Sequence, residues 1–237
     1  NKQVPGQSSV VWHITRTIKF HEGRLYVSVG SGCNACEQPE GEMRGMIYSM
    51  LPDGSDKRVY GDGLRNAVGF TWANGDLYAT ANGVDHLGDN APDELLYKLT
   101  EGEFYGCPYC YESNGNVRAD TSREWENPVD CTTVPRPLTS FEARSAPLGL
   151  TFFGNDAHPA LRNSFLVALH GSFEARNKRG YQIMRVSESG VQEVFIDEFQ
   201  LPDTTRIGRP VDILQHDENS FFFTDDHKGR VFYVYAK

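Results

Sequence analysis

The sequence of 237 residues predicts an all-β fold of the β-propeller type. Helical periodicity is almost absent, and short runs rich in aromatic and β-branched residues recur along the chain instead. Asn-Gly and Asp-Gly turn signals separate these runs. A unit of a few strands returns roughly every 40 to 50 residues, which is typical of propeller blades, because a blade can bury both of its faces only between its neighbours.

Each expected strand is a short apolar run between two turn signals. A turn, a strand such as Leu-Tyr-Val and a second strand ending in Ile-Tyr or Phe-Tyr recur at 23–48, 75–97 and 219–233. The Asn74-Gly75 turn joins one pair of strands directly. In chain order, the expected strands are 24–29, 45–50, 69–72, 76–80, 95–99, 148–153, 164–169, 182–186, 211–214, 220–224 and 230–235.

These strands fill about four to five blades of a single domain that covers residues 1–237. A closed ring of this type usually has about six blades or more, so we expect a six-bladed propeller that lacks part of its N-terminal blades. The first residues resemble the interior of a longer chain. An open blade edge would leave room for a partner chain. The polar, proline-containing stretch at about 111–144 is expected to be a loop insertion.

The composition favours a protein that binds a small molecule. The formal net charge is −9, which argues against nucleic acid as a partner, because sequence-independent binding needs a basic surface. No apolar run approaches the roughly 20 residues of a membrane-spanning helix. Aromatic residues make up 12% of the chain, which suits the inner faces of many short strands.

The five cysteines, Cys33, Cys36, Cys107, Cys110 and Cys131, allow three interpretations. Two C-x-x-C pairs suggest zinc, but roughly 70 residues separate them, which is wide for a compact zinc ribbon. Disulfides that pair Cys33 with Cys36 and Cys110 with Cys131 are favoured. They would place the protein in an oxidising compartment, periplasmic or extracellular. Five reduced thiols in a cytosolic protein are the third possibility.

The segment 63–110 carries the strongest functional signal. Short strands alternate there with loops dense in Gly, Asn, Asp and Arg, and such loops on a rigid scaffold commonly carry binding groups. Arg65 and Asn66 offer donors for an anionic or carbonyl-bearing ligand. The loop 82–89 offers carbonyl and carboxylate oxygens, which are the ligands that a hard cation such as Ca²⁺ prefers. Together these residues indicate a combined metal and anion site.

The order and spacing of several motifs, over about 13–235, resemble the soluble PQQ-dependent sugar dehydrogenases, in particular their sorbosone dehydrogenase-like branch. The matching stretches are His13-Ile14-Thr15-Arg16, 30–36, Gly63-Leu64-Arg65-Asn66, 82–89, Pro92-Asp93-Glu94-Leu95, 105–110, 145–150, His170-Gly171-Ser172, Gly208-Arg209-Pro210-Val211 and Thr224-Asp225-Asp226. The resemblance implies a six-bladed propeller with PQQ and Ca²⁺ as cofactors. It also implies oxidation of an aldose or a related sugar or alcohol by hydride transfer to the quinone. An acceptor such as a cytochrome or a quinone would then take the electrons.

The resemblance implies roles for individual residues as well. His13 is the expected catalytic base, because a neutral imidazole can accept the proton of a sugar hydroxyl. Gly83 and Val84 are expected to bind calcium through their main-chain carbonyls, with Asp93 and Glu94 supporting that loop. The residues expected to contact PQQ, whose three carboxylates suit guanidinium partners, are Arg16, Arg65, Asn66, His170 and Arg209.

A structural explanation competes with each role. His13 beside Trp12 could be a packed histidine, Arg65-Asn66 a capping pair, and Arg209 a partner in a structural salt bridge. The acidic residues Asp85, Asp89 and Asp93 could be turn formers. The chain also departs from the family pattern, at Val84, Cys107, Arg144 and Phe173, and Arg144 and Arg176 are candidates to replace lost cationic contacts. Two further functions therefore stay open: a non-catalytic propeller used as a binding or assembly module, and a calcium-dependent lactonase-like hydrolase.

Overall fold

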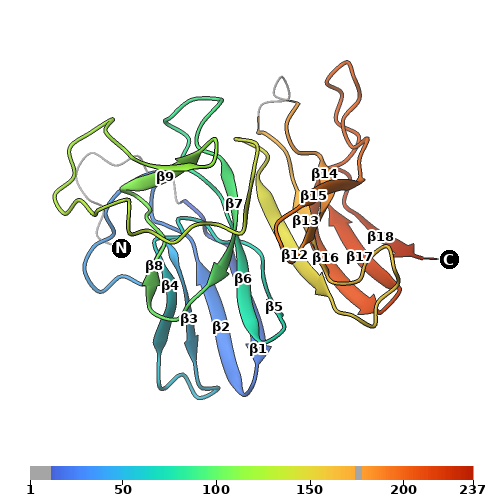
Figure 1. The fold of residues 1–237 in the computed structure, drawn as a ribbon, viewed down its shortest axis with the longest axis horizontal. Coiled ribbons are helices and arrows are strands. Elements are labelled where there is room, and N and C mark those ends of the chain that lie inside the picture. Colours follow the sequence, from blue (N-terminus) through green and yellow to red (C-terminus); the bar gives the residue numbers. More distant parts are fainter. Residues whose placement is uncertain (1–11, 174–177, 237) are drawn as a thin grey trace.

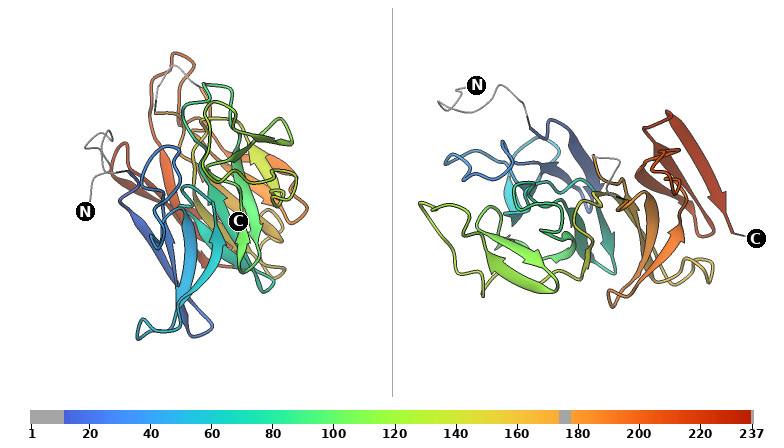
Figure 2. Two further views of the ribbon diagram at one scale, coloured as in Figure 1. Left: turned by 90° about the vertical axis from the view of Figure 1, so that its left-hand side faces the viewer. Right: turned by 90° about the horizontal axis from the view of Figure 1, so that it is seen from above.

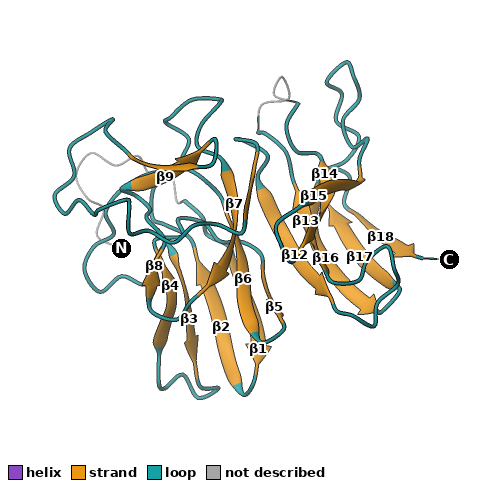
Figure 3. Cartoon of the chain, in the orientation of Figure 1, coloured by secondary structure: helices purple, strands orange, loops and turns teal. Residues whose placement is uncertain are grey.

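The computed structural model describes residues 12–173 and 178–236. Within these ranges all regular structure is β-strand, as the sequence predicts (Figure 3). The strands form four sheets that follow one another in chain order, together with one separate two-stranded hairpin (Figure 1). The described residues contain no helix with the length and hydrophobicity that crossing a bilayer requires.

Each of the four sheets is mainly an antiparallel meander. The first contains β1 (Arg16–His21), β2 (Arg24–Val29), β3 (Met46–Met50), β4 (Arg58–Asp62) and the short parallel strand β8 (Glu103–Phe104). The second contains β5 (Phe70–Ala73), β6 (Asp76–Ala81), β7 (Glu94–Leu99) and β11 (Thr139–Phe141). The third contains β12 (Pro147–Phe153), β13 (Ser164–Leu169), β14 (Gln182–Ser187) and β15 (Gln192–Ile196), and the fourth β16 (Pro210–Asp217), β17 (Ser220–Asp225) and β18 (Arg230–Tyr235). The separate hairpin joins β9 (Cys110–Ser113) to β10 (Asn116–Ala119).

Three of the hairpins turn through two residues that both have positive φ. The pairs are Glu22-Gly23, Asn74-Gly75 and Asn114-Gly115, which join β1 to β2, β5 to β6 and β9 to β10. This backbone matches the twist of antiparallel strands, and glycine at the second position adopts it without a steric penalty. The turn signals in the sequence therefore set the register of these strand pairs.

Alternating side chains pack each sheet between its neighbours. On β6, Leu77 and Ala79 face the core shared with the first sheet, whereas Tyr78 faces the third sheet. On β13, Phe165 lies in the core with the second sheet and Leu166 in the core with the fourth. β13 is buried on both faces, so every residue of 164–169 is buried. This explains why its apolar residues stand at consecutive positions and do not alternate with polar ones.

The first strands of successive sheets converge, as in a propeller. β12 contacts both β5 and β16, the first strands of the sheets on either side (Figure 2). The approach is so close that a Cβ atom added to Gly69 would lie 2.1 Å from the main-chain oxygen of Leu148. A Cβ atom on Gly149 would lie 2.5 Å from the Cα of Asp212. Glycine is therefore required where neighbouring sheets meet.

Most expected strands match observed ones within two or three residues, but seven observed strands were not anticipated: β1, β4, β8, β9, β10, β11 and β15. In β1 and β4 apolar residues are few or alternate with charged ones, whereas β15 contains the apolar run Val194-Phe195-Ile196. Within 111–144 the structure places most of the β9–β10 hairpin, and also β11, which pairs with β7 as the outer strand of the second sheet. Tertiary pairing, which local patterns do not reveal, makes these segments strands.

The favoured cysteine pairing is confirmed. Cys33 bonds to Cys36 and Cys110 bonds to Cys131, so neither C-x-x-C pair is free to hold zinc. Cys107 is the free cysteine of the described residues and lines a small cavity of about 40 Å³. Burial raises the pKa of the Cys107 thiol to about 12.

The close approach between sheets predicts the effect of added methyl groups. We expect Gly69→Ala and Gly149→Ala each to lower the free energy of unfolding by about 1–3 kcal/mol, because main-chain atoms of the next sheet must move. Gly154→Ala is the matched control, since an added Cβ there has no atom within 4 Å. Thermal unfolding followed by circular dichroism measures the three variants. Equal melting temperatures for all three would contradict the predicted convergence.

The cysteine pairing predicts three thiol counts. The folded protein should react slowly with a thiol reagent at pH 8, because burial keeps Cys107 protonated. After unfolding without reductant, one thiol should react, and after reduction all five should react. Absorbance with a chromogenic disulfide reagent measures each count. Five reactive thiols before reduction would rule out both disulfides.

Candidate functional site

One edge of the sheets gathers the sequence-predicted residues around a cavity of about 640 Å³. In an antiparallel sheet, the start of the first strand and the end of the second lie at the same edge. The cavity is accordingly built from the segments that precede β1, β5, β12 and β16 and those that follow β6 and β13, together with Glu94 at the start of β7. The volume is in the range of small-molecule and cofactor sites.

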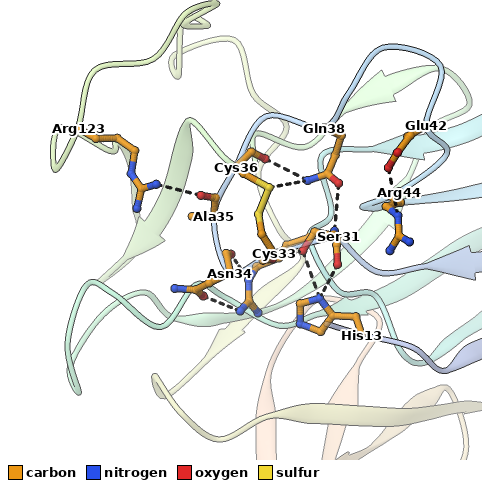
Figure 4. Close-up of a disulfide and its surroundings, with 12 residues drawn as sticks. His13, Ser31, Cys33, Asn34, Ala35, Cys36, Gln38, Glu42, Arg44 and Arg123 are labelled. Carbon is orange, nitrogen blue, oxygen red and sulfur yellow. Dashed lines mark hydrogen bonds and ion pairs between the residues drawn. A yellow bond between two sulfur atoms is a disulfide. The ribbon is translucent and has the colours of Figure 1, made fainter. Parts of the chain in front are cut away.

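His13 is held with one ring nitrogen committed to the main chain. Its Nδ1 lies 2.9 Å from the carbonyl oxygen of Ser31 (Figure 4). A carbonyl only accepts hydrogen bonds, so Nδ1 carries the proton and Nε2 of the neutral ring is left as the basic atom. Burial lowers the pKa of His13, and nearby Arg65 acts in the same direction, while the hydrogen bond to Ser31 opposes them. The ring is therefore neutral at physiological pH.

The disulfide ring 33–36 supports the cavity wall from behind. Between its two cysteines, Asn34 accepts hydrogen bonds through its main-chain oxygen from Arg65 Nε, at 2.8 Å, and through Oδ1 from Arg65 Nη2, at 2.8 Å. The same Oδ1 accepts from the amide of Asp85 at 2.8 Å. Gln38 closes the ring from the outside by bonding to the amide of Gly32 and the carbonyl of Cys36 (Figure 4).

Two guanidinium groups converge on one carboxylate. Arg65 Nη2 lies 2.9 Å from Asp85 Oδ2, and Arg144 Nη1 lies 2.5 Å from Asp85 Oδ1. Arg144 also donates to the main-chain oxygens of Asp85 and Gly88. The Arg65 side chain is only 5% exposed, so its position is fixed by these bonds and by Asn82. Three separate loops are thereby joined at the cavity wall.

Glu94 links the expected metal loop to the segment before β12. It is buried, and its two carboxylate oxygens accept from the amides of Gly83, at 2.7 Å, and Arg144, at 3.2 Å. Burial raises the pKa of Glu94 to about 7, whereas the Gly83 hydrogen bond and the charge of Arg65 lower it. Glu94 therefore titrates close to neutral pH and carries less than a full negative charge there.

The opposite wall is built by His170 and Arg209. Arg209 donates from Nε to the carbonyl of His170, at 3.1 Å, and from Nη2 to that of Gly171, at 2.7 Å. His170 Nε2 lies 3.0 Å from Asp226, and burial lowers the pKa of His170 while this carboxylate opposes the shift. Among the described residues, Arg209 has no carboxylate within ion-pairing distance. Its positive charge is therefore available to a ligand.

Outside the cavity, Arg206 secures the same loop. Its Nη2 donates to the carbonyls of Ser172 and Phe173, and its Nε lies 3.1 Å from the Tyr181 hydroxyl. Both Arg206 and Arg209 lie within 6 Å of the Tyr181 ring centre, at 5.7 and 5.9 Å. Arg209 lines the cavity and Arg206 does not, although the two side chains hold neighbouring carbonyls.

The structure brings together most, but not all, of the sequence-predicted site residues. The residues that line the 640 Å³ cavity are His13, Arg65, Asn66, Gly83, Glu94, His170 and Arg209. Arg16 is exposed and bonds to the main-chain oxygens of His13 and Thr15. Val84 is buried and Asp93 accepts from the amide of Asn114, and both line the smaller cavity beside Cys107.

The positions that depart from the family pattern fall into different surroundings. Arg144 and Phe173 line the large cavity, and Val84 and Cys107 line the small one. Arg176 lies outside the described residues. The contacts of Asp85, Asn34 and Arg206 were not anticipated, since each depends on loops far apart in the chain. Of these three residues, only Asn34 stands in a recognisable local sequence motif, because it lies between the cysteines of a C-x-x-C pair.

The cavity wall suits an anion and a hard cation. Arg65, Arg144 and Arg209 face the carboxylates of Asp85, Asp89 and Glu94, and burial keeps Glu94 only partly ionised near neutral pH, so the wall is not acidic although the whole chain carries −9. Among the described residues, no main-chain donor bonds to the carbonyl oxygens of Gly83 and Val84. The same ranges contain no group of three or more acidic, His or Cys side chains that could hold a metal ion, and carbonyl oxygens are among the ligands that Ca²⁺ accepts.

Two relatives from other organisms match this chain along much of its length. An uncharacterised protein of Borreliella burgdorferi is 29% identical over 235 residues, covering 94% of this chain and 60% of the relative. A pyrroloquinoline quinone-dependent pyranose dehydrogenase of Coprinopsis cinerea is 26% identical over 223 residues, covering 74% of this chain and 30% of that protein. The chain thus spans less than two thirds of the length of either relative.

A solved structure and a family model also match nearly the whole chain. The calcium structure of Trichoderma reesei Carbohydrate-Active Enzymes Family AA12 superposes with a TM-score of 0.73 at 22% identity, covering 94% of this chain and 68% of that one. At this identity the likeness concerns the fold. The TrAA12-like family model matches residues 3–237. The chain therefore belongs to the TrAA12-like family.

Proposed function

We propose that this chain carries the active site of a PQQ- and calcium-dependent oxidoreductase that acts on a sugar. The observation that supports it most is the convergence of a neutral histidine and three arginines on one cavity in an acidic protein. The pyranose dehydrogenase relative, named as PQQ-dependent, supports the choice of cofactor. An aldose or a related sugar or alcohol as substrate, and the sorbosone dehydrogenase-like branch, are the finer parts of this proposal.

The residues present fit the two groups. Arg209, which has no carboxylate partner in the described structure, would hold one carboxylate of PQQ, with Arg65 and Asn66 across the cavity. The carbonyl oxygen of Gly83, which lines the large cavity, would bind Ca²⁺ together with that of the adjoining Val84, which lines the small cavity, and Glu94 would fix their loop through the Gly83 amide. When bound, the quinone supplies a hydride acceptor and the cation supplies Lewis-acid polarisation.

His13 performs the protein's own part of the chemistry. Its Nε2 is the basic atom of the neutral ring, because Nδ1–H is committed to Ser31. A substrate hydroxyl placed within hydrogen-bond distance of Nε2 would transfer its proton there as its carbon becomes a carbonyl. The positive φ of 45° at His13 and the absence of a Cβ at Gly30, where one would lie 2.4 Å from His13 Cβ, fix the ring in place.

The surroundings of the enzyme follow from the same proposal. Two disulfides support a periplasmic or extracellular location. An acceptor such as a cytochrome or a quinone would take the electrons, and an open sheet edge would be the place for a partner chain. Arg16 remains a candidate for an outer cofactor contact, although it lies outside the cavity.

Titration with PQQ, with and without Ca²⁺, tests the proposal through the quinone absorbance. We expect saturable binding that needs Ca²⁺ and weakens at least about tenfold in Arg209→Ala, since a charge-assisted carboxylate contact is lost. Arg206→Ala is the matched control, because Arg206 holds the same loop from outside the cavity. It should bind PQQ within about threefold of the wild type.

Two results would overturn this assignment. Equal loss of PQQ affinity in Arg206→Ala and Arg209→Ala would mean that both arginines act by ordering the loop and that Arg209 does not contact PQQ. A folded wild-type protein that binds no PQQ would favour the binding-module function, or a lactonase-like hydrolase if a lactone is hydrolysed with Ca²⁺ alone.

The role of His13 predicts a specific pH dependence. His13→Ala should bind PQQ normally but lose sugar oxidation by at least about a hundredfold, because general-base catalysis is removed. In the wild type, the acid limb of kcat/KM should lie below pH 6.5, since the folded-state pKa of His13 is lowered and its neutral form persists to lower pH. Steady-state kinetics from pH 4.5 to 8 would measure the limb. An acid limb above pH 7, or one unchanged in residual His13→Ala activity, would contradict the assignment.

A further inference from the structure

The contacts around Asp85 have the form of a ligand site that is already filled. Arg65 Nη2 and Arg144 Nη1 each bind a different oxygen of the same carboxylate, at 2.9 and 2.5 Å. Two guanidinium groups on one carboxylate are typical of anion recognition, because each oxygen receives a charge-assisted hydrogen bond. Here the anion is a side chain of the protein itself.

The three side chains differ sharply in exposure. The Arg65 and Arg144 side chains are 5% and 14% exposed, whereas the Asp85 side chain is 55% exposed, and all three line the large cavity. The two cations are thus fixed in the wall, while the carboxylate approaches them from the open side. A ligand in the cavity would reach the arginines from the direction that Asp85 now occupies.

We propose that Arg65 and Arg144 form a carboxylate clamp that Asp85 fills in the ligand-free protein and that a carboxylate of the bound ligand takes over. The inference rests on the proposed function for the identity of that ligand, PQQ. It assigns Arg144, which stands at a departure from the family pattern, as a residue that selects carboxylate-bearing ligands. It assigns Asp85 as an internal competitor.

The exchange requires only a side-chain rotation. Arg144 Nη2 holds the main-chain oxygens of Asp85 and Gly88, and Asn34 holds the Asp85 amide, so the backbone of the loop stays bound when the carboxylate leaves. One carboxylate replaces another, so the clamp keeps the same charge and the same hydrogen bonds. The Asp85 carboxylate is already more than half exposed, so water screens its ion pairs and breaking them costs little.

Removal of the competitor should tighten binding. If Asp85 fills the clamp about 90% of the time, the apparent Kd is about tenfold above the intrinsic one, and Asp85→Asn should recover that factor. Asp89→Asn is the matched control, because Asp89 lines the same cavity with the same charge but makes no ion pair in the described structure. It should change the Kd by no more than about twofold. Isothermal titration calorimetry with PQQ and Ca²⁺ measures all variants, and thermal unfolding verifies that each is folded.

Arg144→Gln separates the clamp from a general charge effect. It should weaken PQQ binding about tenfold, and adding Asp85→Asn to it should then tighten binding by less than the same change does in the wild type, because Asp85 keeps only its contact with Arg65. Equal effects of Asp85→Asn and Asp89→Asn, or weaker binding by Asp85→Asn, would overturn the proposal. Absence of PQQ binding in the wild type and in every variant would instead reject the proposed function, so the two failures are distinguishable.

Discussion

The convergence of the first strands is the constraint on which the rest of the structure depends. Where two sheets meet, Gly69 lies so close to Leu148 that the contact has no space for a side chain. The loops that connect the converging strands therefore gather at one edge of the sheets. Residues from distant segments then share one cavity. Several of the residues on its wall (His13, Arg65, Arg144 and Ala146) have positive φ without being glycine, a strained conformation that is common at functional sites.

The cavity arginines are satisfied mainly by main-chain carbonyls. Arg65 bonds to the oxygens of Asn34 and Asn82, and Arg209 to those of His170 and Gly171. Carbonyl oxygens supply hydrogen-bond partners without cancelling the charge, so the guanidinium groups remain fixed and keep their attraction for anions. An acidic protein can in this way maintain a local positive field, which requires loops that present several carbonyls to one side chain.

Much of the fold, but less of the site, could be predicted from the sequence. Apolar runs between turn signals located most strands, and the two-residue turns revealed their pairing. β1 and β4 were missed because their strand character comes from pairing with neighbours and not from an apolar run. Motifs indicated His13 and Arg65 as site residues, but the contact between Arg144 and Asp85 spans 59 positions and joins two loops, so no local pattern encodes it. The burial of Val84 away from the large cavity likewise depends on packing alone.

The disulfide between Cys33 and Cys36 connects the chemistry of the compartment to the geometry of the site. The ring that it closes contains Asn34, and Asn34 Oδ1 accepts hydrogen bonds from both Arg65 and Asp85. The disulfide therefore restricts the movement of two residues of the cavity wall. No residue of this ring belongs to the three hydrophobic core clusters of the described residues. A chain folded in a reducing cytosol would lose this ring and, with it, the constraint on Asn34 beside the cavity wall. The choice of expression host thus affects how firmly the cavity wall of a purified sample is held.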